Sequence, residues 1–123
     1  MTENITELTN LLRELQAMNS DITGSSIVSI QGLPICSALP NETNEGIVSA
    51  MSAAILSVSE RAVEELSRGD LKRVLIEGVD GTVLLSRAGQ NAIICVLLQE
   101  NASLGMVFLH VQSTSKKIAL LLD

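Results

Sequence analysis

The chain has 123 residues, a length that suits one domain with its own hydrophobic core. Hydrophobic residues make up 46% of it and charged residues 18%, which excludes an intrinsically disordered chain. The formal net charge of −6 and the presence of one aromatic residue, Phe108, argue against nucleic-acid binding, because phosphates repel an acidic chain and bases need aromatic platforms.

The N-terminal segment predicts an amphipathic helix over residues 4–18. Its apolar residues recur at steps of three and four, the spacing of one helical face: Ile5, Leu8, Leu11, Leu12 and Leu15. Thr2 or Asn4 is expected to cap its start. The segment has neither the basic lead nor the apolar stretch of a signal peptide, so we expect a cytoplasmic protein.

Two short strands are predicted over residues 26–30 and 35–39. The first is rich in β-branched residues, and the intervening Gln31-Gly32-Leu33-Pro34 has the composition of a turn. The two strands are therefore expected to form a hairpin.

A long helix is expected from Thr43 or Asn44 to Ser67, with Asn41 or Thr43 as its cap and Gly69 beyond its end. One apolar stripe of this helix is expected to cover a sheet. The stripe consists of Ile47, Met51, Ile55, Val58, Ala62 and Leu66. A second set stacks on another face and consists of Ala50, Ala54 and Ser57, with Val48, Ser52 and Leu56 beside it.

No charged side chain occurs in this helix from Gly46 to Ser59. The run is shorter than the roughly 20 apolar residues of a membrane span, so no membrane insertion is expected. A surface helix normally presents a charged face to water, so something must cover this one. A second copy of the chain, crossing about a two-fold axis, would do so. The alternative is a helix sunk within its own domain.

Three further strands are predicted over residues 72–77, 82–87 and 92–98. Asp80-Gly81 is a hairpin signal between the first two. The third is apolar on both of its alternating faces, which predicts a position in mid-sheet. A final helix over residues 103–122 carries an apolar stripe of Leu104, Phe108, Val111, Ile118 and Leu122. The chain is thus predicted to be one α+β domain, residues 1–123, with an antiparallel sheet between helices.

No set of residues predicts an enzyme, a metal site or a cofactor site. His110 is the only histidine, and the two cysteines, Cys36 and Cys95, are expected to be buried free thiols, with a disulfide as the alternative. No phosphate-binding glycine loop or serine elbow occurs. Glu64 and Arg68 have the spacing of a surface ion pair. Function is therefore expected to reside in surfaces.

Four segments in this order and spacing resemble the Roadblock family, dynein light-chain-like domains that also occur as regulators of Ras-like GTPases. They are Ser29–Ser37, Ser49–Leu56, Ile76–Leu84 and Asn101–Met106. Gln31 departs from the pattern, since many members carry Asp before this glycine. The resemblance implies a five-stranded antiparallel sheet of order 2-1-5-4-3, with the long helix on one face and the two terminal helices on the other.

The resemblance also implies a dimer that pairs the long helices and joins the third strands into one sheet. The dimer-interface residues would be Ser49, Ala50, Ala53, Ala54, Ser57, Arg61, Lys72, Val74 and Ile76. Arg61 and Arg68 are the candidate contacts to a further partner. The partners expected are a second copy or a paralogue, and a small Ras-like GTPase.

We therefore expect a non-catalytic homodimeric scaffold that binds such a GTPase and modulates its activity or location. One alternative is a purely structural dimerisation module or motor light chain without GTPase contact. Another is a small-molecule sensor with a pocket between sheet and helix. It ranks last because no convergent polar residues mark a pocket in the sequence.

Overall fold

A computed structural model describes residues 2–123, with side-chain positions from residue 4 onward. The elements follow one another along the chain as α1 (Thr2–Met18), β1 (Ile22–Ser29), β2 (Pro34–Ala38), α2 (Glu45–Glu65), β3 (Val74–Gly78), β4 (Gly81–Ala88), β5 (Ala92–Gln99) and α3 (Leu104–Leu122). Every helix and strand expected from the sequence is present, with ends that differ by up to four residues.

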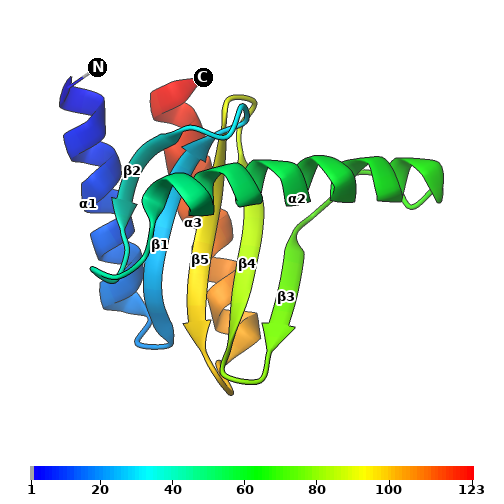
Figure 1. Ribbon diagram of the computed structural model, residues 1–123. Helices are drawn as coiled ribbons and strands as arrows, with labels where there is room; N and C mark the ends of the chain where they lie inside the picture. The colour runs from blue at the N-terminus through cyan, green and yellow to red at the C-terminus, as the bar shows by residue number, and fades with distance from the viewer. Residues whose placement is uncertain (1) are drawn as a thin grey trace.

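The five strands form one antiparallel sheet in the order β2-β1-β5-β4-β3, as the family resemblance implied (Figure 1). β5 lies in the middle and pairs with β1 and β4. Its residues from Ala92 to Val96 are all buried, because helices cover the sheet on both sides there. The prediction of a central strand is therefore confirmed.

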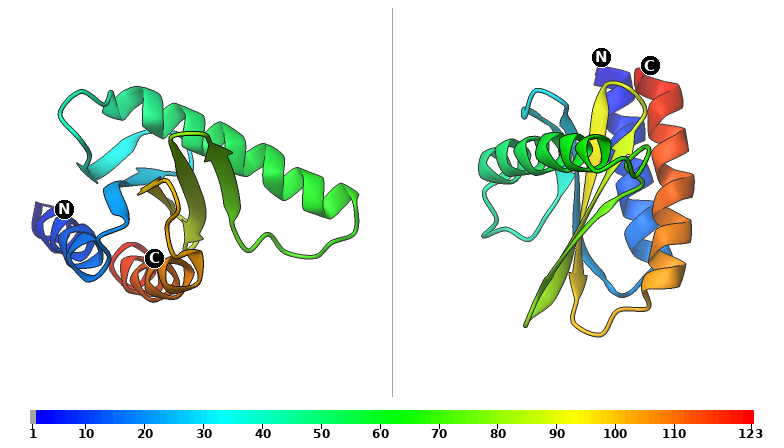
Figure 2. Two further views of the ribbon diagram at one scale, coloured as in Figure 1. Left: turned by 90° about the horizontal axis from the view of Figure 1, so that it is seen from below. Right: turned by 90° about the vertical axis from the view of Figure 1, so that its right-hand side faces the viewer.

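Helices cover the two faces of the sheet unequally. Figure 2 shows α2 alone on one face and α1 beside α3 on the other. Figure 1 and the left view of Figure 2 show the C-terminal turns of α2 extending past β3, beyond the edge of the sheet. The fold is thus the expected α+β sandwich, with one helix on one side and two on the other.

The β1–β2 hairpin closes through the expected turn. The Ser29 N–H donates to the Leu33 carbonyl at 2.8 Å, and Gly32 has φ of +94°, a conformation that favours glycine. β1 begins at Ile22, four residues before the predicted strand, because pairing with β5 extends it. That extension runs through Gly24, a residue type that is depleted in strands.

The ends of α2 differ slightly from the prediction. Asn44 is the cap, since its Oδ1 accepts a hydrogen bond from the Ile47 N–H at 3.0 Å, whereas Asn41 or Thr43 was expected. The helix ends at Glu65, and Ser67 already has φ of +56°. The Arg68 N–H donates to the Val63 carbonyl at 2.7 Å, and Gly69 then turns the chain with φ of +85°.

Each cysteine lies in a different core cluster. Cys36 of β2 packs among side chains on the α1–α3 side of the sheet, and Cys95 of β5 packs on the α2 side. Both are free and buried, which confirms the first of the two alternatives. Burial raises the pKa of both thiols above the ordinary value of 9.0, so both remain protonated and unreactive at neutral pH.

Candidate interaction surface

Small residues take several positions on the face of α2 that meets the sheet. Ser49, Ser52 and Leu56 are buried, and the Ser49 Oγ donates to the Glu45 carbonyl at 2.8 Å. Ala53 is half-buried and lies against Gly32 in the β1–β2 turn. These short side chains let the helix backbone approach the sheet closely.

The large apolar stripe of α2 points the other way. The prediction that it covers the sheet is wrong for most of its members, because Ile47 is 56% exposed, Met51 51%, Val58 70% and Leu66 66%. Ile55 is the exception, since it is half-buried and packs against the cluster under α2. Sequence reasoning assumed that the largest apolar residues face inward. Here Ser49 and Ser52 occupy part of the inner face instead, and the Ser49 hydroxyl bonds to its own helix.

The outer face of α2 is therefore apolar and uncovered in the single chain. Its exposed residues are Ile47, Ala50, Met51, Ala54 and Val58, and we call them the outer α2 face. Of the residues assigned to a dimer interface, Ala50, Ala54, Ser57 and Arg61 are exposed, and Ala53 is half-buried. Ser49 is 0% exposed, so it contacts its own domain and not a partner.

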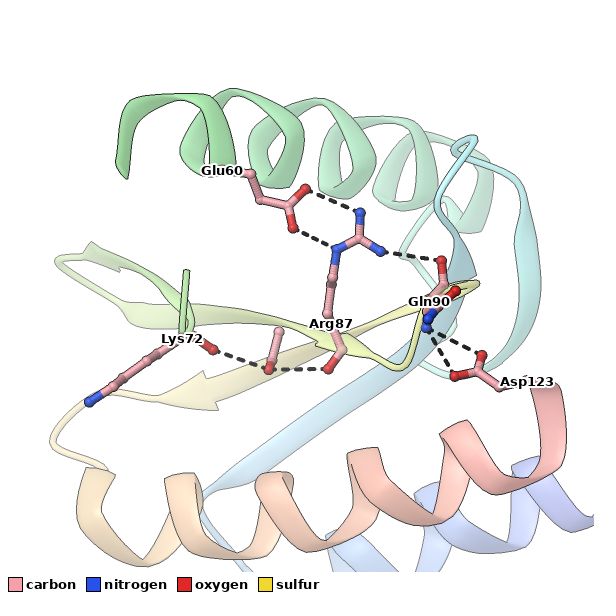
Figure 3. A network of polar contacts seen from close by, with 6 residues as sticks. Glu60, Lys72, Arg87, Gln90 and Asp123 are labelled. Atoms are coloured by element: carbon pink, nitrogen blue, oxygen red, sulfur yellow. Dashed lines mark hydrogen bonds and ion pairs between the residues drawn. The ribbon is translucent and has the colours of Figure 1, made fainter. Parts of the chain in front are cut away.

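The other part of the predicted interface is the edge of the sheet at β3. This outermost strand pairs with β4 alone. Val74 is half-buried in the cluster under α2, and Ile76 is 39% exposed. Lys72 falls outside the strand, which begins two residues later than predicted, and its side chain extends away from α2 (Figure 3). Val74 and Ile76 thus remain on the edge, whereas Lys72 does not.

Two arginines lie near the projecting end of α2. The Arg61 Nε is 3.3 Å from Glu65 Oε1, and both side chains are well exposed. Among the described residues, this pair forms in place of the expected pair between Glu64 and Arg68. Arg68 follows the helix and is exposed. Both candidate partner contacts are therefore accessible at the same end of the helix.

A further ion pair, which sequence reasoning missed, holds α2 against the sheet. Arg87 of β4 donates to Glu60 through Nε at 2.5 Å and through Nη2 at 3.2 Å, and its Nη1 donates to the Gln90 carbonyl at 3.2 Å (Figure 3). The hydrogen bond to Glu60 raises the pKa of Arg87. Glu60 looked like part of a solvated helix end, and only the charge of Arg87 within an apolar strand hinted at a partner.

The possible metal ligands among the described residues do not converge. His110 Nδ1 lies 2.8 Å from Asn19 Nδ2, an ordinary partner for a half-buried histidine. No group of three or more His, Cys, Asp or Glu in the described part of the chain is placed to hold a metal ion. By length and composition alone, α2 is the one described helix that fits a membrane span. Its inner face, however, packs on the sheet.

Comparison with known proteins agrees with this geometry. The family model of the Roadblock/LC7 domain matches residues 8–98. Proteins MJ1340 and MJ0310 of Methanocaldococcus jannaschii are each 34% identical over 97 residues, which are 79% of this chain and 84% of theirs.

Solved structures share the fold at lower identity. A Roadblock/LC7 domain from Streptomyces avermitilis has a TM-score of 0.85 at 18% identity and covers 91% of this chain and 94% of its own. Myxococcus xanthus MglB has a TM-score of 0.85 at 15% identity, and the match covers 97% of this chain and 92% of the MglB chain. On the strength of the family match and the sheet order, this chain belongs to the Roadblock/LC7 domain family.

Proposed function

We propose that this chain is a dimeric, non-catalytic scaffold that binds a small Ras-like GTPase and modulates its activity or location. The observation that carries the proposal is the outer α2 face, which leaves large apolar side chains in water unless another surface covers them. Membership of a family that includes regulators of Ras-like GTPases supports the choice of partner.

The proposed dimer places two outer α2 faces against each other. Ala50 and Ala54 allow close approach of the helix backbones, and Met51 and Val58 supply apolar area around them. A similar structure, MglB, was solved in a tetrameric arrangement, which supports self-assembly of this fold.

The open edge of β3 completes the proposed interface. Its unpaired backbone groups would hydrogen-bond with the same strand of a second copy and continue the sheet. An isologous contact of this kind uses one patch twice and closes on itself, as most soluble homo-oligomers do. The interface would thus include Ala50, Ala53, Ala54, Ser57, Val74 and Ile76, without Ser49 and Lys72. Arg61, which was expected in the interface and is exposed, would lie at its border.

Arg61 and Arg68 would contact the GTPase at the projecting end of α2. An exposed guanidinium suits an acidic or phosphate-bearing partner, because its planar fork donates two parallel hydrogen bonds. Arg61 is already oriented by Glu65. An Arg61→Ala variant that bound the GTPase and left its hydrolysis rate unchanged would remove a role for this residue in the nucleotide cycle.

Light scattering tests the proposal directly. The purified chain is measured alone at micromolar concentration and then with the host's small GTPases, each loaded with GDP or with a GTP analogue. We expect a dimer whose mass increases with one nucleotide form. A monomer at this concentration would contradict the dimer, and a dimer that ignores every GTPase would favour the purely structural module.

A further inference from the structure

A cavity of about 650 Å³ opens between the β3–β4 end of the sheet and α3. α3, which forms one wall of the cavity, covers the face of the sheet opposite α2 (Figure 2), so pairing through the outer α2 face does not cover this wall. Lys72 and Arg73 directly precede β3, so the cavity adjoins the β3 edge of the proposed dimer. Its volume falls in the range of about 300–1,000 Å³ that is typical of small-molecule sites. Leu84 and Ser86 line it from β4, and Phe108, Val111 and Ser115 line it from α3.

The charge of this cavity is opposite to that of the chain. The protein carries a net charge of −6, with 14 acidic and 8 basic residues. Four of those basic residues line the cavity, and no acidic residue does: they are Lys72, Arg73, Arg87 and Lys116. Low-dielectric walls lined by one sign of charge concentrate ligands of the opposite sign.

Three of these four cations are available to a ligand. Arg87 is bound to Glu60. In the described part of the chain, no carboxylate forms an ion pair with Lys72, Arg73 or Lys116. The Arg73 guanidinium stacks over Phe108 at 4.3 Å from the ring centre. This stacking places a positive charge directly beside an apolar wall.

The cavity also contains an unsatisfied donor. Ser115 is 7% exposed, and its Oγ is the one buried side-chain oxygen or nitrogen in the described residues without a hydrogen-bond partner. A buried hydroxyl without a partner is destabilising, so such groups are retained where something else satisfies them. An acceptor on a bound molecule would do so.

We infer that this cavity binds a small amphiphilic anion, a phosphate ester with an apolar body. The cations attract the phosphate, the Ser115 hydroxyl donates to an oxygen of the ligand, and the apolar body lies against Phe108 and Val111. A phosphate is preferred to a carboxylate because it carries more charge and more acceptor oxygens.

One end of the cavity suits the anionic group better than the other. Asp123 lies against Gly89, and its carboxylate accepts hydrogen bonds from the Gln90 N–H and the Asn91 side-chain amide. Figure 3 shows Lys72 and Asp123 on opposite sides of Arg87. The phosphate is therefore expected towards Lys72 and Arg73, away from the acidic end.

Octyl phosphate is the probe, titrated below its micellar concentration and followed by amide chemical shifts. Octylammonium, octanoate and inorganic phosphate are the comparison ligands. Octyl phosphate is expected to bind most tightly and to shift residues of β3, β4 and α3 rather than α2. Equal binding of octylammonium would overturn the inference, and equal binding of octanoate would overturn the preference for phosphate.

Neighbouring lysines supply a matched pair of variants. Lys116 lines the cavity and Lys117 does not, although both are exposed lysines in the same turn of α3. Lys116→Gln is expected to weaken octyl phosphate binding by about fivefold, which corresponds to one charge contact in water. Lys117→Gln is expected to leave it unchanged. Equal effects of the two variants would overturn the site, whatever the state of the proposed dimer.

Ser115→Ala separates binding from folding. Removal of an unsatisfied buried hydroxyl is expected to leave the free protein at least as stable to heat as the wild type. The same variant is expected to bind octyl phosphate several-fold more weakly. If binding is unchanged, Ser115 takes no part in the site, and the inferred hydrogen bond is wrong.

Discussion

The two faces of the sheet differ in how many apolar side chains they bury. On the α1–α3 side, 15 buried hydrophobic residues of the described chain form one cluster, with Leu8, Leu12 and Leu15 of α1 at 0% exposure. On the α2 side the corresponding cluster has 5 members. The first face is completed within one chain, whereas the second leaves half of its helix uncovered.

The reason lies in which residues α2 directs inward. Full burial of a leucine stabilises by about 1.5–3 kcal/mol, and α2 buries only one, Leu56, beside Ser49 and Ser52. Its larger residues, such as Met51 and Val58, remain in water. The difference teaches that this helix serves two surfaces, and that the outer one is the more apolar.

Truncation of one leucine on each face gives the largest expected effects. Leu12→Ala is expected to lower the free energy of unfolding by about 4 kcal/mol, and Leu56→Ala by about 2 kcal/mol, because the thinner cluster collapses more easily around a cavity. Urea denaturation measures both values. A larger loss in the free energy of unfolding for Leu56→Ala than for Leu12→Ala would contradict the view that the α1–α3 side is the better packed face.

A charge on the outer α2 face is expected to dissociate the proposed dimer. Val58→Arg buries an unpaired guanidinium in that interface, so the mass measured by light scattering should halve, while the far-ultraviolet circular dichroism stays unchanged. Leu120→Arg is the matched control, since Leu120 is an apolar residue of α3 with 85% exposure on the opposite side. If both variants remain dimeric, the outer face is not the interface.

Neutralisation of Glu60 is expected to have a smaller effect. Glu60→Gln weakens the bond to Arg87 and should destabilise by about 0.5–1 kcal/mol, the upper range for a partly exposed ion pair. Glu65→Gln, which breaks the more exposed pair with Arg61, should cost less than about 0.3 kcal/mol. Thermal unfolding of the two variants at low and high salt provides the test. Equal losses would mean that the Arg87 pair does not fasten α2.

The smallest expected effect is confined to acidic pH. Hydrogen bonds from the Ser103 N–H and from Gln99 lower the pKa of Asp21 below 3.8. Because the pKa is lower in the folded state, Asp21 stabilises the fold above pH 3.8, and this contribution is lost as the pH falls through the lowered pKa. Asp21→Asn should therefore be less stable than the wild type at pH 7. A stability difference that persists undiminished at pH 2 would contradict this assignment.

Some features could be predicted from local pattern alone. The apolar run from Ala92 to Val96 has no polar face, so a central strand was the only position that satisfied it. The leucines of α1 recur at helical spacing, and Leu8, Leu12 and Leu15 are buried as this spacing predicts. The absence of charge from Gly46 to Ser59 likewise predicted a helix without a charged face.

Other features depended on distances that no local pattern contains. Most of the α2 stripe that was expected to cover the sheet is exposed, because apolarity alone does not say whether a side chain packs in the core or lies on the surface. The pairing of Glu60 with Arg87 joins residues 27 positions apart. The cationic cavity was missed for the same reason, since Lys72 and Arg73 are 42 or more positions from Ser115 and Lys116.

The sequence by itself determined the order of the elements, the central place of β5 and the charge-free stretch of α2. These follow from side-chain periodicity, which is a property of neighbouring residues. The tertiary structure decided which face of α2 is buried, which charges pair and where a cavity forms. Those outcomes depend on how closely helices approach the sheet, and that approach is set by packing among residues far apart in the chain.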